Sequence, residues 1–400
     1  MRAVVFTLGC KVNEVESSSI MAGLEKEGWE VDDKLSYADA YVLNTCAVTR
    51  EAEKKSRQLI ARAKKFNPDA KIFVCGCASE KDAESFLSRG VYFVTGARKK
   101  HEVLKAFFKA YEKEALPYPK HTKTRAFIKI QDGCNNFCSY CIIPYLRGRE
   151  TSRPAEDVLN EISVTDSPEI VLNGINISSY EGGLDKLISA MKGVNKRVRL
   201  GSLECGVIED KLLSALRDLP DFAPQFHLSL QSGSTDVLKS MNRHYTREEY
   251  LNKCKLIYEY FPDAGITTDI IAGFPTETEE DFQKSLSIIN EARFAKVHAF
   301  GYSPREGTVS YKMKDIPADV KSDRVHRLIE AGEKSAERFK TRFLGSVCEI
   351  IAEEYCDGYT GGYTGNYIRV YVSEKLKAGI KYKVKLTELY KDGVIAEIYG

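Results

Sequence analysis

The sequence predicts an α/β protein with three consecutive domains, over residues 1–115, 120–343 and 344–400. In the first two ranges, short apolar runs alternate with amphipathic helical patterns, which is typical of parallel sheets covered by helices. In the last range, apolar and polar residues alternate and glycines recur, which is typical of a small antiparallel barrel. Because 43% of the 400 residues are apolar and 29% are charged, the chain can bury cores of this size.

In the first range we expect strands over 3–8, 41–44, 72–76 and 92–95, and helices over 12–27, 52–66 and 81–88. Cys10, Cys46 and Cys77 follow the first three strands in turn. Ligands of open α/β sheets bind beyond the carboxyl ends of the strands, so these three thiols could meet at one edge of the sheet. The alternative is that they are three unrelated buried cysteines. Either Cys75 or Cys77 could be the third ligand, since residues two apart on a strand share a face. Gly76 favours Cys77, because it marks the end of the strand and leaves that thiol in the loop.

The second range repeats strand and helix six times, with strands expected over 126–131, 169–173, 197–202, 226–230, 265–272 and 296–302. Six units in about 220 residues predict a partial barrel of parallel strands, smaller than the usual eight. Asp269 lies inside an apolar strand, where an unpaired carboxylate is costly, so we expect it to have a polar partner or to face the site. His227 and His298 also lie in strands, and we expect them in the core rather than at a metal.

The last range is expected to contain strands over 347–353, 367–372, 381–389 and 394–398. Its charge is balanced, with eight basic and eight acidic residues from Arg342 onward, so charge does not predict RNA binding there. Tyrosines at 359, 363, 367 and 371 either pack within the sheet or stack on bases.

Three thiols, Cys134, Cys138 and Cys141, lie within eight residues after the first strand of the predicted barrel. A [4Fe–4S] cluster takes four ligands, so three cysteines leave one iron for a small molecule. Zinc would need a second Cys or His pair further on, and none follows. The chain has no secretory start and no apolar run of about 18 residues, so we expect a cytoplasmic protein. Eleven cysteines in such a chain indicate metal or redox chemistry rather than disulfides.

These motifs resemble the radical S-adenosylmethionine (SAM) methylthiotransferases over essentially the whole chain. The resemblance rests on Cys134-x3-Cys138-x2-Cys141 with the continuation IIPYLRGR and SRP, and on TLGCKVN at 7–13, LNTCAVT at 43–49, GC at 76–77, SLQSG at 229–233, GFPTE at 273–277 and YSPREGT at 302–308. It implies a flavodoxin-like N-terminal domain, a central partial (βα)6 radical SAM barrel and a C-terminal TRAM barrel. Cys75 is an extra thiol beside a family position, and the chain is somewhat short.

The resemblance also implies cofactors and roles. SAM binds the open iron of a [4Fe–4S] cluster on Cys134, Cys138 and Cys141, and its cleavage gives a 5′-deoxyadenosyl radical that takes hydrogen from C2 of an adenine. The sulfur comes from a second [4Fe–4S] cluster, whose ligands are Cys10, Cys46 and Cys77. A second SAM molecule provides the methyl group. The expected SAM contacts lie at the ends of barrel strands and are Gly174, Asn176, Ser202, Glu204, Ser229 and Gln231. The expected substrate contacts are Arg147 and Arg149.

Within the family, LGCKVN and NTCAVT are similar to the branch that methylthiolates C2 of N6-threonylcarbamoyladenosine-37 (t6A to ms2t6A) in tRNA. Its partners are a tRNA anticodon stem-loop and an electron donor such as flavodoxin or ferredoxin, with no membrane; we expect a monomer. Branches that act on isopentenyladenosine or on a ribosomal-protein aspartate are alternatives. An RNA-binding iron–sulfur or zinc protein without turnover is an alternative of a different class.

Overall fold

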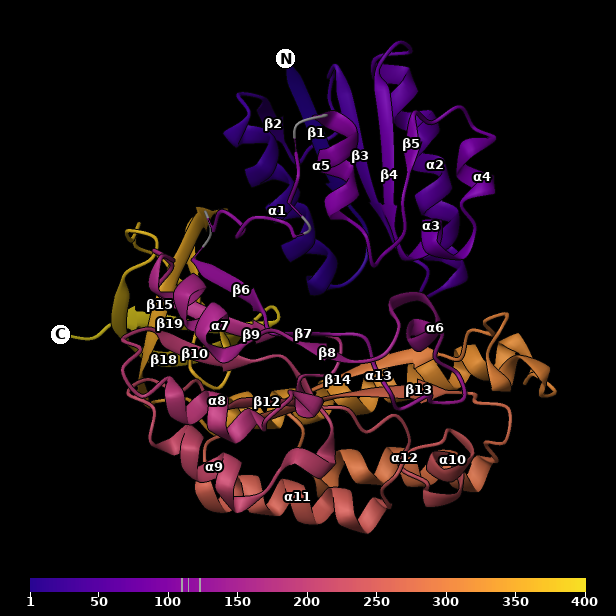
Figure 1. Ribbon diagram of the computed structural model, residues 1–400. Helices are drawn as coiled ribbons and strands as arrows, with labels where there is room; N and C mark the ends of the chain where they lie inside the picture. The colour runs from indigo at the N-terminus through magenta and orange to yellow at the C-terminus, as the bar shows by residue number, and fades with distance from the viewer. Residues whose placement is uncertain (109–110, 114, 122–123) are drawn as a thin grey trace. The chain divides into compact units, whose positions relative to one another are not determined.

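The computed structural model describes residues 1–400 except 109–110, 114 and 122–123, and these residues form two compact units (Figure 1). The N-terminal unit comprises Met1–His121, Gln131–Thr151 and Ser303–Tyr311, and the barrel unit comprises Thr122–Ile130, Ser152–Tyr302 and Lys312–Gly400. The boundaries of the three expected domains therefore stay a prediction. Among the described residues, no helix combines the length and the apolar content that a membrane crossing needs.

The N-terminal unit contains a five-stranded parallel sheet in the order β2-β1-β3-β4-β5. The strands are β1 (Arg2–Thr7), β2 (Glu30–Asp32), β3 (Ala40–Thr45), β4 (Lys71–Gly76) and β5 (Phe93–Val94). This 2-1-3-4-5 order is that of flavodoxin, which confirms the predicted fold of this part. The sequence pattern missed β2, because this strand has only three residues and none of them is buried.

Helices cover both faces of this sheet (Figure 1). Helices α1 (Lys11–Lys26) and α5 (His101–Phe107) pack on one face, in a core that includes Ala3 and Val5. Helices α2 (Arg50–Phe66), α3 (Cys77–Lys81) and α4 (Glu84–Leu87) pack on the other, with Val4. The helix expected over 81–88 is wrong: two short helices replace it. Gly76, with φ 108°, turns the chain from β4 directly into α3.

The barrel unit holds the predicted parallel strands in two neighbouring sheets. One has the order β10-β9-β6 and the other β11-β12-β13-β14. The strands are β6 (Arg125–Lys129), β9 (Glu169–Asn173), β10 (Arg197–Leu200), β11 (Ser202–Leu203), β12 (Gln225–Leu228), β13 (Gly265–Ala272) and β14 (Lys296–Gly301). All their pairings are parallel, as a partial (βα)6 barrel requires. The strand expected over 197–202 is interrupted at Gly201.

The helices of the barrel unit are α7 (Ala155–Ser163), α8 (Leu184–Ala190), α9 (Asp210–Arg217), α10 (Thr235–Ser240), α11 (Arg247–Tyr260), α12 (Glu279–Glu291) and α13 (Ala318–Thr341). The barrel unit also contains the 3-10 turns Ile177–Ser179 and Cys205–Val207, and the remaining short elements of the chain are β7 (Gln131–Asp132), α6 (Ile143–Arg147), β8 (Thr151–Ser152) and the 3-10 turn Val309–Lys312. One large apolar core joins the barrel strands to α7, α8, α9, α11 and α12.

The C-terminal strands close into a small barrel in the order β15-β16-β17-β19-β18. They are β15 (Val347–Cys356), β16 (Tyr359–Tyr363), β17 (Arg369–Val372), β18 (Lys381–Tyr390) and β19 (Gly393–Ile398). Four pairings are antiparallel, as expected, and β17 with β19 is parallel. The pattern missed β16, because its sequence YTGGY has the glycines of a turn.

Aromatic and charged side chains fasten this small barrel to β6, β9 and β10. Tyr363 and Tyr367 stack with ring centroids 4.6 Å apart. The Arg125 guanidinium lies 4.5 Å from the Tyr363 ring, and that of Arg199 lies 4.7 Å from Tyr367. Glu169 pairs with both arginines, at 2.6 Å from Arg125 and 3.2 Å from Arg199. These two tyrosines therefore stack on each other and on arginines of the same unit, which favours the packing role over stacking on RNA bases.

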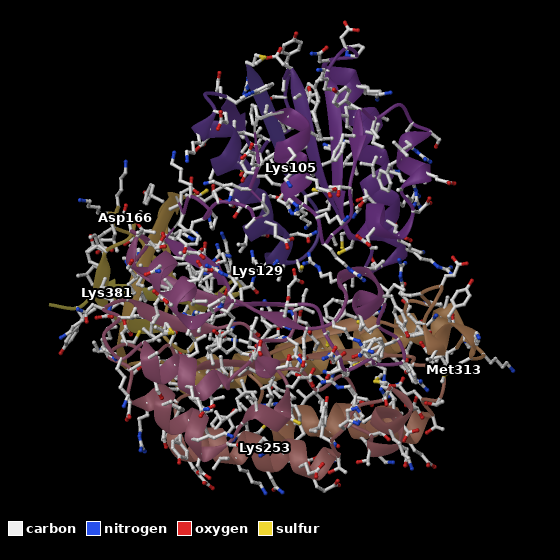
Figure 2. All side chains as sticks on the ribbon, in the orientation of Figure 1. Lys105, Lys129, Asp166, Lys253, Met313 and Lys381 are labelled. Carbon is white, nitrogen blue, oxygen red and sulfur yellow. The ribbon has the colours of Figure 1, made fainter. Side chains whose placement is uncertain are left out.

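A second ion-pair cluster fastens the same barrel at β10. Arg197 contacts Glu349 of β15 at 2.7 Å and Asp221 at 3.4 Å. Lys381 of β18, labelled in Figure 2, contacts Asp221 at 2.5 Å. Together the two clusters explain why the small barrel belongs to the barrel unit.

Candidate functional site

The loops at the carboxyl ends of β1, β3 and β4 each carry one of the predicted ligands. Cys10 is the N-cap residue of α1, Cys46 directly follows β3, and Cys77 is the first residue of α3. In the 2-1-3-4-5 order the chain reverses direction across the sheet between β1 and β3, and that point is where such sheets bind ligands. The structure therefore places all three loops at the binding edge that the topology provides.

Hydrogen bonds hold these loops together. Asn13 Nδ2 donates to the carbonyl of Leu8 at 2.8 Å and to that of Thr45 at 3.1 Å, which joins the loops after β1 and β3. A Cβ on Gly9 would lie 3.2 Å from Cys46 Sγ, so the loop that carries Cys10 passes close to the Cys46 thiol. Thr45 Oγ1 accepts from the Ser79 amide at 3.3 Å, which adds the first turn of α3.

The thiols of this group influence one another electrostatically and differ in exposure. Cys10 is exposed, whereas Cys46 and Cys77 are buried. Burial raises the pKa of Cys46, and the neighbouring thiols of Cys77 and Cys10 raise it further. Burial also raises the pKa of Cys77, while the Arg147 and Lys100 charges and a hydrogen bond from Arg147 oppose that rise. Nearby cations favour the thiolate, which is the form that binds a metal.

Cys75 lies on the opposite side of the sheet from Cys77. It belongs to the core beneath α1 and α5 and is fully buried, and burial raises its pKa to about 12. Cys77 instead packs with the core of the α2 face. The expectation that Cys75 and Cys77 share a face is wrong, because Gly76 ends the strand between them. This geometry supports Cys77 as the ligand of the group.

Arg147 is the centre of a buried ion-pair network beside Cys77. Its guanidinium contacts Glu16 of α1 at 3.1 Å and Asp132 at 2.9 Å, and donates to Asn13 Oδ1 at 2.5 Å. Lys100 also pairs with Glu16. Only 1% of the Arg147 side chain is exposed. The buried side chain supports the cysteine site in this structure, and contact of Arg147 with substrate, which the sequence suggested, stays a prediction.

A second arginine supports the loop after Cys46. Arg305, from the YSPREGT segment, donates to the carbonyl of Ala47 at 2.6 Å and pairs with Glu53 of α2 at 3.1 Å. Its side chain is 3% exposed. The sequence marked the segment as a family motif but did not reveal this role, because the motif lies more than 250 residues from the loop that it supports.

The Cys134–Cys141 loop is closed at its base by backbone contacts. The Cys134 amide donates to the Gly148 carbonyl at 3.2 Å, and the Cys141 amide to the Cys138 carbonyl at 2.9 Å. A Cβ on Gly133 would lie 2.1 Å from the Arg149 carbonyl oxygen, so this position requires glycine. Cys134 and Cys141 are partly exposed and Cys138 is buried.

Aromatic contacts shape the outside of this loop. Phe137, with φ 46°, meets Tyr145 edge-on with ring centroids 5.6 Å apart. The Arg149 guanidinium lies 4.6 Å from the Phe137 ring. Arg149 is exposed, unlike Arg147, so its charge is accessible to a polyanion.

Both cysteine groups lie in the N-terminal unit. Helix α6, which follows Cys141, packs against α3, which begins with Cys77. Ile142 and Leu146 share one apolar core with Ala47 and Cys77. Residues far apart in sequence thus bring the two thiol groups into one compact body.

The six residues predicted to contact SAM lie after strands of the barrel unit. Gly174 and Asn176 follow β9, Ser202 and Glu204 lie in and after β11, and Ser229 and Gln231 follow β12. The structure links two of them through a residue that sequence reasoning missed, Arg243. Arg243 pairs with Glu204 through both guanidinium nitrogens and donates to the Ser229 carbonyl at 3.4 Å.

Arg243 gave little signal in the sequence. It lies in the segment MNRHY, outside every predicted strand and helix, and Asn242 before it has φ 58°. Its side chain is only 4% exposed, whereas that of Glu204 is 26% exposed, so a buried Arg243 positions a more exposed carboxylate.

Comparison with known proteins agrees with this architecture. A profile described as "Uncharacterized protein family UPF0004" matches residues 2–96, and one described as "Radical SAM superfamily" matches residues 128–289. The chain is 38% identical to "Threonylcarbamoyladenosine tRNA methylthiotransferase MtaB" of Bacillus subtilis (strain 168), over 88% of this chain and 85% of that protein. It is 39% identical to the protein of the same name from Chlamydia pneumoniae, over 86% of this chain and 85% of that protein.

The chain is also 36% identical to "tRNA-2-methylthio-N(6)-dimethylallyladenosine synthase" of Clostridium perfringens (strain SM101 / Type A), over 87% of this chain and 86% of that protein. Among solved structures, the radical SAM methyltransferase TsrM from Kitasatospora setae aligns with a TM-score of 0.55 over 75% of this chain and 74% of that chain. The cobalamin-dependent radical enzyme OxsB aligns with a TM-score of 0.53 over 83% of this chain and 56% of that chain. At 12% identity, these two structures show a shared fold alone.

Proposed function

Because this chain belongs to the radical SAM tRNA methylthiotransferase family, we propose that it adds a methylthio group to C2 of N6-threonylcarbamoyladenosine-37 in tRNA. The observation that carries the proposal is the presence of two groups of three cysteines in one compact unit. A radical SAM enzyme needs one such group, whereas insertion of sulfur calls for a second. The identity of 38–39% with two MtaB proteins supports the threonylcarbamoyl substrate.

Membership of the radical SAM superfamily implies SAM and a [4Fe–4S] cluster. We assign that cluster to Cys134, Cys138 and Cys141. The chemistry that it supplies when bound is one-electron cleavage of SAM at the iron that no cysteine ligates. The protein's own part is to present three thiols from one short loop. Closure of that loop at Gly133 and Gly148 fixes their spacing.

Cys10, Cys46 and Cys77 are the proposed ligands of a second [4Fe–4S] cluster, which would supply the sulfur to be transferred. The donor set fits this role, because the three thiols come from loops at one edge of the sheet and two cations lie beside the buried Cys77. The Arg147 charge opposes the rise of the Cys77 pKa, and the guanidinium pairs with Glu16 of α1. Outer contacts of this kind orient metal ligands and tune their basicity.

SAM binding falls to the strand ends of the barrel unit. Glu204 is held in place by Arg243 and Ser229 lies next to it, so their polar groups have fixed directions. Gly174, Asn176, Ser202 and Gln231 complete the proposed contacts. Fixed polar groups reduce the ordering cost when a flexible cofactor binds.

Recognition of the anticodon stem-loop involves Arg149 in this proposal, because its guanidinium is exposed beside the Cys134–Cys141 loop. A flavodoxin or ferredoxin supplies the electron, and the enzyme acts as a monomer. Each of these assignments rests on the chemistry of the family.

The test uses two synthetic anticodon stem-loops that differ only in the modification of A37, one with threonylcarbamoyladenosine and one with isopentenyladenosine. Reconstituted enzyme, SAM and a reductant are added, and nucleosides are quantified by liquid chromatography and mass spectrometry. We expect the methylthio product from the threonylcarbamoyl substrate. Methylthiolation of the isopentenyl substrate alone would reassign the chain to the other tRNA branch, and deoxyadenosine formation without either product would refute both.

A further inference from the structure

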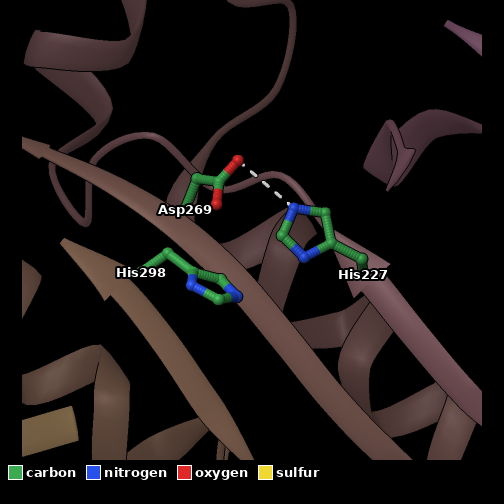
Figure 3. Close-up of side chains that lie close together, drawn as sticks. All are labelled: His227, Asp269 and His298. Carbon is green, nitrogen blue, oxygen red and sulfur yellow. Dashed lines mark hydrogen bonds and ion pairs between the residues drawn. The ribbon is translucent and has the colours of Figure 1, made fainter. Parts of the chain in front are cut away.

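Two imidazoles and a carboxylate converge in the barrel unit, outside both cysteine groups. His227 lies on β12, Asp269 on β13 and His298 on β14. Asp269 and His298 are direct register partners on their parallel strands. One nitrogen or oxygen atom from each side chain lies within 4.8 Å of the other two. Figure 3 shows the three side chains gathered on the same side of these strands.

The polar atoms of this cluster are only partly used by the protein. His227 Nε2 lies 3.2 Å from Asp269 Oδ2, and its Nδ1 lies 3.0 Å from Thr267 Oγ1. In the described part of the chain, His298 has no hydrogen bond to protein, and no protein donor contacts Asp269 Oδ1. The side chains of His227 and Asp269 are 16% and 30% exposed, so small solutes reach them.

Packing alone does not explain these residues. The expectation of a polar partner for Asp269 is confirmed by His227, but both histidines are partly exposed rather than enclosed in the core. Replacing a partly buried ion pair with apolar residues is often neutral or stabilising, so stability gives no reason for a carboxylate between two imidazoles here. Lys296, on the same face of β14, forms no ion pair with Asp269 among the described residues.

We propose that His227, Asp269 and His298 bind one divalent transition-metal ion of the zinc class, in addition to any iron–sulfur cluster. Two histidines and one carboxylate with open positions are the ligand set of catalytic zinc and non-haem iron(II) sites. The ligand atoms are His227 Nε2, an Asp269 carboxylate oxygen and a ring nitrogen of His298. Water or a substrate group occupies the remaining positions.

The neighbours of His227 prepare it for this role. Gln225 Nε2 donates to Thr267 Oγ1 at 3.1 Å, and Thr267 Oγ1 has a second lone pair for Nδ1–H of His227. Without a cation, Nε2–H of His227 donates to Asp269 and the Thr267 hydroxyl donates to Nδ1. A bound cation selects the other tautomer, in which Nδ1–H donates to Thr267 and the Nε2 lone pair faces the metal. Metal-binding histidines commonly have their second nitrogen fixed in this way.

The test measures zinc on the full-length protein with both cysteine groups loaded with iron, so that free thiols do not compete. The protein is equilibrated with buffered Zn2+ and desalted, and zinc and iron are counted by mass spectrometry. We expect about one zinc per wild-type chain. Asp269→Asn and His298→Gln should weaken zinc binding at least about 100-fold, and Thr267→Val about 10- to 100-fold. His326→Gln, which changes an exposed histidine of α13, is the matched control and should bind zinc as wild type does.

X-ray absorption of the wild-type protein gives a second readout that needs no variant. We expect Zn–N and Zn–O distances of about 2.0–2.2 Å and no Zn–S distance near about 2.3 Å. Sulfur ligation, no zinc uptake by wild type, or equal uptake by wild type and His298→Gln would each overturn the inference. Loss of methylthiolation in Asp269→Asn with unchanged zinc uptake would instead assign the cluster to substrate contact. Failure of the proposed tRNA activity leaves this measurement unaffected.

Discussion

Arg147→Met should loosen the N-terminal unit around α1. The substitution removes the guanidinium that contacts Glu16 and Asp132, and the Glu16 side chain is only 7% exposed. Removing one partner of a buried ion pair costs about 3–5 kcal/mol. Lys100 still neutralises Glu16, and Asp132 is 23% exposed, so we expect the lower end, about 3 kcal/mol. That value corresponds to on the order of 100-fold in an opening equilibrium.

Hydrogen exchange followed by mass spectrometry reports this opening locally, which suits a chain with two compact units. Peptides from Lys11–Lys26 should exchange on the order of 100-fold faster in Arg147→Met than in wild type. Arg149→Met is the matched control, because Arg149 is exposed and its contact with the Phe137 ring is worth about 1 kcal/mol at most. Equal exchange of α1 in the two variants would show that the buried network does not hold the site.

Three further changes have defined outcomes. Gly133→Ala should reduce the iron bound at the Cys134 loop, as measured by iron analysis, because its Cβ would lie 2.1 Å from a backbone oxygen. Gly182→Ala is the control, because Gly182 has a similar positive φ but open space around it. A normal iron content of Gly182→Ala would separate the effect of the clash from that of backbone strain. Arg199→Met should make the C-terminal barrel more sensitive to limited proteolysis by removing a buried partner of Glu169, and unchanged cleavage rates would contradict the fastening role. Cys75→Ser should keep the full iron content, since this thiol lies in the core under α1; loss of about half of the iron would make it a ligand.

Sequence periodicity was sufficient for the large elements because their apolar patterns are long. Most strands of the parallel sheets follow from short apolar runs, and the long helices α1 and α2 follow from amphipathic patterns. The failures have local causes. β2 is short and unburied, β16 is rich in glycine, and Gly76 converts an expected loop into the first turn of α3.

The cysteines could be found from sequence, whereas their supports could not. Spacing and motif resemblance indicate all six thiols, because the residues around each one resemble family motifs. Arg147, Arg243 and Arg305 act through partners 14 to 258 residues away, so no local pattern reveals what they contact. Arg147 was predicted to contact substrate because it lies beside the cysteine loop, and only the structure reveals that Glu16 and Asp132 pack around it.

In the proposed reaction, Cys134, Cys138 and Cys141 serve radical formation, and Cys10, Cys46 and Cys77 serve sulfur delivery. Reconstituted wild type, Cys138→Ser and Cys46→Ser are mixed with SAM, reductant and the threonylcarbamoyl stem-loop, and both deoxyadenosine and methylthiolated nucleoside are quantified in each reaction. We expect both products from wild type, neither from Cys138→Ser, and deoxyadenosine alone from Cys46→Ser. Methylthiolated nucleoside from Cys46→Ser at the wild-type level would contradict the assignment of sulfur delivery to Cys10, Cys46 and Cys77.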